Sequence, residues 1–137
     1  MLTSARNTLT GKIKTLHSGT VLSEITLEVG ATTITATLTN DSLQDLGFTV
    51  GDDAFALIKA SSIILAKKLP QKLSARNLIP GHIVTLQNGA VNSEVIIEIG
   101  GAKLTSIITQ DAVKDLNLQV GDAIFAIFKA SSVIIGA

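Results

Sequence analysis

Residues 24–47, EITLEVGATTITATLTNDSLQDLG, combine two kinds of structural signal in one short stretch. Residues 24–29 and 32–38 are rich in β-branched and apolar residues and flank Gly30-Ala31, a pattern that predicts a β-hairpin. The period then changes, and capping residues at 39–41 with Gly47 at the end predict a short helix. A hairpin followed directly by a short helix indicates a small β-rich domain.

The flanking segments complete this pattern. A β-branched run around Ile13 precedes the hairpin and ends at the turn Ser18-Gly19. After the helix, a turn at 50–52 leads into two apolar strands at 54–58 and 62–65. Three strands, a short helix and two strands are the element order of the five-stranded OB-type barrel. We therefore expect an all-β fold with one short helix per domain.

The same pattern occurs twice along the chain. Ser-Ala-Arg-Asn at 4–7 returns at 74–77, and Lys-Ala-Ser-Ser at 59–62 returns at 129–132, with one constant offset and no gap. Nearly half of the paired positions are identical, so the chain is an internal duplication. The segment between the copies is charged and contains a proline, as linkers do. We expect two OB-like five-stranded β-barrels in tandem, with the first domain at 1–66, the linker at 67–73 and the second domain at 74–137.

Composition narrows the possible functions. The chain has no cysteine, which excludes disulfides and thiolate-bound metals, and two histidines are too few for a histidine zinc site. Single-strand nucleic-acid binding needs a basic groove and stacking rings, whereas this chain has zero net charge, no Trp and no Tyr. Its four phenylalanines lie in apolar contexts and are expected in the core. We expect no metal cation and no nucleic-acid partner.

The balance of residue types also bears on assembly and location. Hydrophobic residues make up 46% of the chain and charged residues 16%, an apolar excess for two small domains. Such an excess indicates an interface between copies, for which symmetric homo-oligomers are the common solution. The sequence has no apolar run of about 20 residues and no secretory leader, so we expect no membrane partner and a cytoplasmic protein.

The recurrent motifs carry hydrogen-bond donors and no catalytic group. His17 and His82 do not occupy equivalent positions, and the recurrent carboxylates suit helix caps, turns and solvated strand faces, so no catalytic residue is predicted. The two signatures instead contain hydroxyls, a guanidinium and an ammonium without a carboxylate, which suits an oxyanion. A structural role, as a strand start and a strand turn, explains the same residues equally well.

These motifs resemble the molbindin, or Mop, domain. Ser-Ala-Arg-Asn, the central Gly-Ala-Val-Asn-Ser-Glu-Val at 89–95 and Lys-Ala-Ser-Ser occur in matching order and spacing, and the resemblance covers both copies. A chain of two such domains is similar to the tandem (di-Mop) molbindins of the ModG type. The resemblance implies an OB-like barrel that binds molybdate or tungstate without an organic cofactor, a homotrimer, and cytoplasmic molybdenum storage or homeostasis. The alternative is a structural or oligomerisation module without a ligand.

The resemblance also implies site residues, with the start motif and the helix mouth from one domain and the lysine motif from a neighbouring domain. The implied molybdate-binding residues are Ser4, Ala5, Arg6, Asn7, Thr39, Lys59, Ala60 and Ser61, and Ser74, Ala75, Arg76, Asn77, Thr109, Lys129, Ala130 and Ser131. A second kind of oxyanion site, in the central glycine loop near the symmetry axis, implies Gly19, Thr20, Val21 and Ser23, and Gly89, Ala90, Val91, Asn92 and Ser93. Leu22 stands where the second copy has Asn92, so we expect the two loops to differ.

Overall fold

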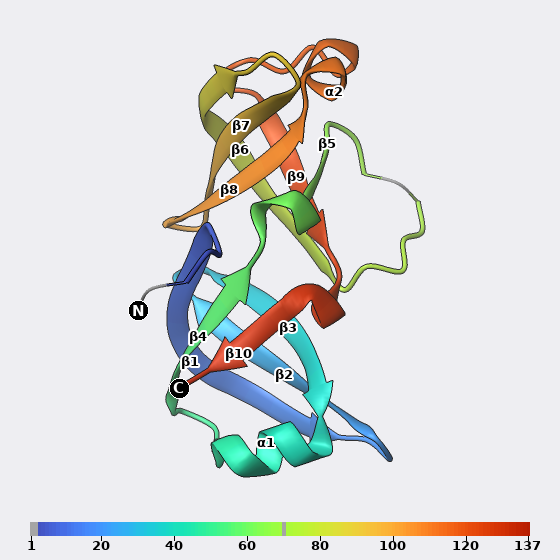
Figure 1. Cartoon of the computed structure of the whole chain (residues 1–137). Helices are drawn as coiled ribbons and strands as arrows, with labels where there is room; N and C mark the ends of the chain where they lie inside the picture. The colour runs from blue at the N-terminus through green and yellow to red at the C-terminus, as the bar shows by residue number, and fades with distance from the viewer. Residues whose placement is uncertain (1–2, 70) are drawn as a thin grey trace.

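The computed structural model describes residues 3–69 and 71–137 and consists of two small barrels lying end to end (Figure 1). Each barrel is a curled five-stranded antiparallel sheet with one short helix, which confirms the predicted fold class. The first repeat contains β1 (Asn7–Ser18), β2 (Leu22–Val29), β3 (Thr32–Thr39), α1 (Asn40–Leu46), β4 (Asp53–Ile58), the 3₁₀ turn η1 (Ala60–Ser62) and β5 (Ile64–Ala66).

The second repeat has the same element order. It contains β6 (Asn77–Asn88), β7 (Asn92–Ile99), β8 (Ala102–Thr109), α2 (Gln110–Asp115), β9 (Ala123–Phe128), the 3₁₀ turn η2 (Ala130–Ser132) and β10 (Val133–Gly136). Within the described residues, neither α-helix has the length or the apolar character needed to span a bilayer.

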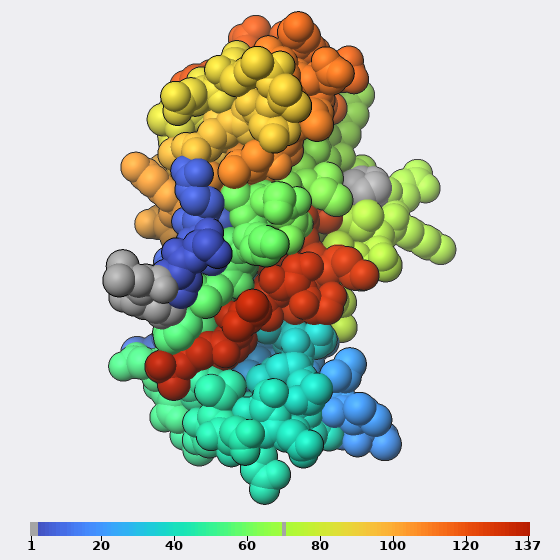
Figure 2. Space-filling view, in the orientation of Figure 1, coloured from blue at the N-terminus to red at the C-terminus, as the bar shows by residue number. Residues whose placement is uncertain are grey.

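The last strand of each repeat belongs to the barrel of the other repeat. The sheet orders are β10-β4-β1-β2-β3 and β5-β9-β6-β7-β8, so β10 pairs with β4 and β5 pairs with β9. Figure 1 shows β10 among the strands of the first barrel, and in Figure 2 the red C-terminal strand lies across the surface of that barrel. The sequence pattern predicts both strands correctly but does not indicate which barrel each one completes.

The helices end where the sequence predicts. Thr39 caps α1 by accepting a hydrogen bond from the Ser42 N–H at 3.1 Å, and Gly47 closes the helix in the left-handed conformation. In the second repeat Thr109 caps α2, and Asn117 follows the helix with φ +49°. Asn is the residue other than Gly that most readily adopts this conformation, so both helices terminate by the same device.

A single apolar cluster runs through both barrels because alternate residues of every long strand point inward. Ile25, Leu27 and Ile34 are fully buried in the first barrel, and the exchanged Val133 joins the same cluster. Phe128 is buried as predicted, whereas the other three phenylalanines are only half-buried. The strand exchange makes the two cores one packing unit.

Gly11 and Gly81 lie where two strands approach closely. A Cβ placed on Gly11 would lie 2.0 Å from the Glu28 carbonyl oxygen, and one on Gly81 would lie 2.3 Å from the Glu98 carbonyl oxygen. Backbone atoms cannot move aside as a flexible side chain can, so we expect Gly11→Ala to lower the free energy of unfolding by about 3 kcal/mol. Urea denaturation measures this, with the exposed neighbour Thr10→Ala as control; equal midpoints for the two variants would contradict the prediction.

Candidate functional site

The start motif and the lysine motif of the first repeat meet in one cavity. Asn7 lies opposite Ile58 in the β1–β4 ladder, so the residues before β1 lie beside those after β4. The cavity there has a volume of about 320 Å³, and its lining includes Ser4, Ala5 and Lys59. Ser132 also lines it, from the second repeat, because the exchanged chain passes through η2 into β10. Within this chain the lysine of the cavity therefore comes from the same repeat as Ser4. The strand exchange adds Ser132 of the other repeat to the cavity lining.

The asparagine of each start motif joins the two repeats. The Asn77 amide donates to the Thr35 carbonyl at 2.8 Å and accepts from the Thr35 N–H at 2.8 Å. Asn7 makes the same two bonds with Thr105, at 2.8 and 2.7 Å, and both asparagines are at most 3% exposed. Each amide bonds to the N–H and the C=O of one residue on the edge strand β3 or β8, as a neighbouring strand would. These amides are committed to the fold, although the resemblance implied them as anion ligands.

Removing one amide should destabilise the chain measurably. Asn77→Leu leaves the partly buried N–H and C=O of Thr35 without these partners, and each orphaned group costs about 1–3 kcal/mol. We expect the free energy of unfolding to fall by about 3 kcal/mol in urea titrations. Asn92→Leu is the matched control, because Leu22 occupies the equivalent exposed position of the first repeat. Equal losses in the two variants would show that the amide does not hold the repeats together.

The arginine of each start motif forms an ion pair with a glutamate of the other repeat. The Arg76 guanidinium meets the Glu24 carboxylate with two contacts, 2.8 Å from Nη1 to Oε2 and 2.9 Å from Nη2 to Oε1. Arg6 pairs with Glu94 across the other junction through one contact, from Nη2 to Oε2. The guanidinium groups are thus engaged with carboxylates. The sequence pattern places these glutamates on solvated strand faces, and their recurrence at equivalent positions is the only signal of the pairing.

The helix-mouth threonine lies far from this cavity. Thr39 pairs with Leu22 at one end of the first barrel, whereas the start motif lies at the other end of the 12-residue β1. Thr39 instead lines a hollow of about 350 Å³ that also contains Thr20 and Val21 of the central loop. The structure therefore brings Ser4, Ala5 and Lys59 together but separates Thr39 from them within the chain.

The central loops border a pocket on each barrel. The pocket of the second repeat, about 330 Å³, is lined by Asn88, Gly89, Asn92, Ser93 and Glu94, among others. Ser93 is 1% exposed, and its hydroxyl contacts Gln110 Oε1 at 2.7 Å, so it stabilises the loop from inside. We refer to this as the Asn92 pocket.

The first repeat has an equivalent pocket of about 350 Å³, which we call the Leu22 pocket. Its lining includes Gly19, Leu22, Ser23 and Glu24, and Ser23 is again 1% exposed. The Leu22 side chain is 53% exposed at the pocket, where the second repeat presents an amide. The expected difference between the two loops is therefore a difference in polarity at the pocket rim.

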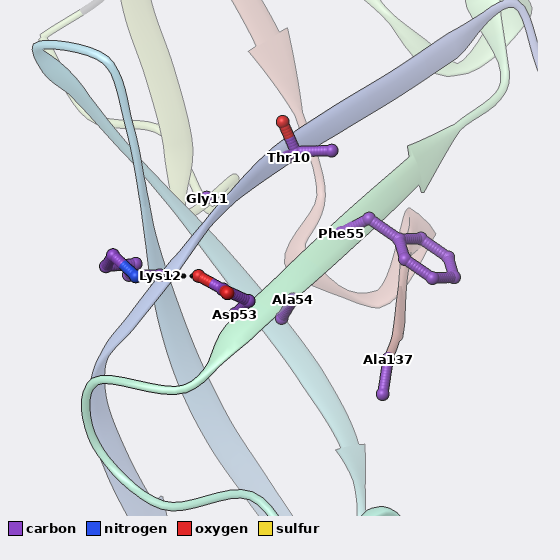
Figure 3. A pocket seen from close by; sticks show the side chains of 7 residues that line it. All are labelled: Thr10, Gly11, Lys12, Asp53, Ala54, Phe55 and Ala137. Atoms are coloured by element: carbon purple, nitrogen blue, oxygen red, sulfur yellow. Dashed lines mark hydrogen bonds and ion pairs between the residues drawn. The ribbon is translucent and has the colours of Figure 1, made fainter.

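A further cavity, of about 480 Å³, contains none of the implied site residues (Figure 3). It lies between β1, β4 and the C-terminal end of β10, and Figure 3 shows Phe55 beside Ala137. Lys12 and Asp53 form an ion pair of 2.7 Å at its edge, and the hydrogen bond that the Lys12 ammonium donates to Asp53 raises the pKa of Lys12. Because the Lys12 ammonium is paired with the Asp53 carboxylate, it is not free to bind an anion in this cavity.

Comparison with known proteins assigns both repeats to one family. The TOBE domain model matches residues 3–65 and 73–135. The chain belongs to the TOBE domain family. The predicted resemblance to tandem molbindin domains is thereby confirmed, because both TOBE repeats also align with a solved tandem-domain structure over their whole length.

That structure is the cytoplasmic molybdate-binding protein ModG with molybdate bound. It is 36% identical in sequence, the match covers 100% of this TOBE chain and 99% of the ModG chain, and the TM-score is 0.95. Among curated proteins, the molybdenum transport protein ModE of Herbaspirillum seropedicae is 38% identical over 138 residues, 98% of this chain and 51% of ModE. The molybdenum-pterin-binding protein MopA of Rhodobacter capsulatus is 37% identical, over 98% of this chain and 52% of MopA. The chain thus spans about half the length of these curated relatives.

Proposed function

We propose that this protein binds molybdate as an oxyanion and serves as a cytoplasmic store or buffer for molybdenum, without catalysing a reaction. The observation that carries the proposal is the cavity in which Ser4, Ala5 and Lys59 meet Ser132 of the other repeat. It offers hydroxyls, backbone groups and one exposed ammonium, and no carboxylate lines it among the described residues. The full-length similarity to molybdate-bound ModG supports the same ligand.

The chemistry of this cavity suits a tetrahedral dianion. Molybdate carries no proton at neutral pH and accepts hydrogen bonds on every side, whereas monohydrogen phosphate must also donate one. Each charge-assisted hydrogen bond contributes about 1.5–3 kcal/mol. A few such bonds, less the cost of ordering the site, correspond to about micromolar affinity. Tungstate has the same charge and shape and is proposed as a second ligand, whereas the smaller sulfate is discriminated by cavity size.

We further propose that the protein is a homotrimer whose complete sites lie between copies. The implied ligands Thr39 and Ser4 lie at opposite ends of one barrel, so a neighbouring copy is needed to bring them together. Val21 and Val91 are 69% and 73% exposed at the central loops, which leaves apolar surface for such a contact. The alternative is a trimer that assembles without any ligand and has only a structural role.

Calorimetry of the purified full chain with sodium molybdate, tungstate and sulfate tests the function. We expect heat of binding at micromolar concentrations with the first two anions and much weaker binding of sulfate. An absence of heat with both molybdate and tungstate would overturn the proposal. Native mass spectrometry with and without molybdate tests the assembly: trimers carrying bound oxyanion support it, and trimers that stay empty favour the structural alternative.

A further inference from the structure

Each Arg–Glu pair connects the start motif of one repeat with the central-loop pocket of the other. Arg6 directly follows Ser4 and Ala5 of the cavity described above, and its partner Glu94 lines the Asn92 pocket. Arg76 reaches Glu24 of the Leu22 pocket in the same way. The same connection therefore occurs at both junctions of the duplicated fold.

A glutamate carboxylate at each of these pockets disfavours anion binding there: Glu94 at the Asn92 pocket and Glu24 at the Leu22 pocket. Among the described residues that line the Asn92 pocket, Glu94 alone carries a formal charge, and that charge is negative. Its side chain is 27% exposed, as is that of Glu24, so solvent screens either carboxylate only in part. An unpaired carboxylate at this position would repel a dianion by charge.

The arginine of the opposite repeat neutralises the charge of this glutamate by forming an ion pair with it. The two contacts between Arg76 and Glu24 have the fork geometry that binds a carboxylate most strongly, so the guanidinium is occupied by the glutamate. Neutralising a carboxylate requires only that the pair form, and the guanidinium need not touch the anion. The arginine can therefore favour anion binding without being a ligand.

We propose that the arginine of each Ser-Ala-Arg-Asn motif is a positioning residue that masks a carboxylate of the opposite repeat, Glu94 for Arg6 and Glu24 for Arg76, and does not itself bind the anion. This inference rests on the proposed oxyanion-binding function and adds a role for the two glutamates. It distinguishes three roles for the arginine: a ligand, a structural clamp and a charge mask. Only a charge mask becomes dispensable when the carboxylate is also removed.

Four versions of the full chain test the proposal by calorimetry with molybdate at one fixed, low ionic strength. They are the unaltered chain, R6Q/R76Q, E24Q/E94Q and the quadruple variant R6Q/R76Q/E24Q/E94Q. We expect R6Q/R76Q to bind about tenfold more weakly, because two bare carboxylates then face the pockets. E24Q/E94Q should bind at least as tightly as the unaltered chain, and the quadruple variant should return to within about threefold of it.

Two controls separate charge masking from other effects. K12Q/K67Q changes the net charge by the same amount and also breaks two ion pairs, those with Asp53 and Asp122. Neither lysine lines the Asn92 pocket, the Leu22 pocket or the cavity of Ser4 and Lys59. It should bind molybdate as the unaltered chain does; if it weakens binding as much as R6Q/R76Q, net charge is the cause and the proposal is wrong. Thermal melts by circular dichroism establish that each variant is folded.

The outcomes are distinct. If the quadruple variant binds as weakly as R6Q/R76Q, the arginine is a ligand or a clamp and the proposal is overturned. If R6Q/R76Q does not fold, the comparison of E24Q/E94Q with the quadruple variant decides: equal affinity supports masking, and a further tenfold loss shows that the guanidinium binds the anion. Failure of the unaltered chain to bind molybdate overturns the proposed function, whereas binding without rescue overturns only this inference.

Discussion

Removal of residues 133–137 is expected to open the first barrel and to leave the second barrel closed. These residues contain β10, which pairs with β4 from Val133 opposite Ile58 to Gly136 opposite Phe55. Val133 is 4% exposed, and burial of such a side chain stabilises the fold by about 1.5–3 kcal/mol. With the half-buried Ile135 and the lost ladder, we expect the free energy of unfolding to fall by about 3–6 kcal/mol.

Hydrogen exchange locates this effect along the chain. In the truncated protein, amides of β4 should lose protection, whereas those of β9 should retain it, because β9 pairs with β5 of the first repeat. Two matched substitutions complete the test. Val133→Asp should expose the first barrel, and Ile63→Asp, at the equivalent position of the other repeat, should expose the second. Loss of protection in β9 after the truncation would show that the strands are not exchanged.

The strands and helices can be predicted from the sequence because their signals are local. Alternating apolar residues, the turn at Gly30 and the capping residues Thr39 and Gly47 each act within a few positions of the chain. The strand exchange has no local signal. The turn at 60–62 directs the chain out of one barrel, and the strand after it would have the same apolar pattern in either barrel. Duplication makes the two destinations nearly equivalent, so the pattern cannot distinguish them.

The sequence predicts which hydrogen-bond donors the candidate site contains, but not which of them lie close together. Ser4, Ala5 and Lys59 do meet, because β1 and β4 are adjacent strands of any OB-type order. The partners of Arg6 and Asn7 are Glu94 and Thr105, which belong to the other repeat. These contacts join residues of different repeats, so they depend on how the two barrels pack against each other, which no local sequence pattern indicates. The start motif thus serves the junction between repeats through Arg6 and Asn7, while Ser4 and Ala5 line the proposed anion cavity.

Replacement of both signature lysines should abolish most of the oxyanion affinity. Lys59→Ala combined with Lys129→Ala removes the ammonium from each copy of the lysine motif, and Lys59 lines the cavity shared with Ser4. A charge-assisted hydrogen bond contributes about 1.5–3 kcal/mol, so we expect molybdate affinity to fall about tenfold to hundredfold. Calorimetry with molybdate measures the change, and Lys12→Ala is the control because Lys12 lies outside this cavity.

The lysine variant should remain folded, which makes its binding defect interpretable. Lys59 and Lys129 are exposed, and neither side chain caps the 3₁₀ turn that follows it. Lysine acts as a point charge, whereas arginine presents a planar fork, so Lys→Arg at both positions should restore the charge but only part of the affinity. The salt dependence of binding should also decrease in the alanine variant, since an exposed cation contributes a screened attraction. Unaltered affinity in the folded double variant would show that these lysines do not contact the anion, and the proposed site would then have to be built from the hydroxyls and backbone groups alone.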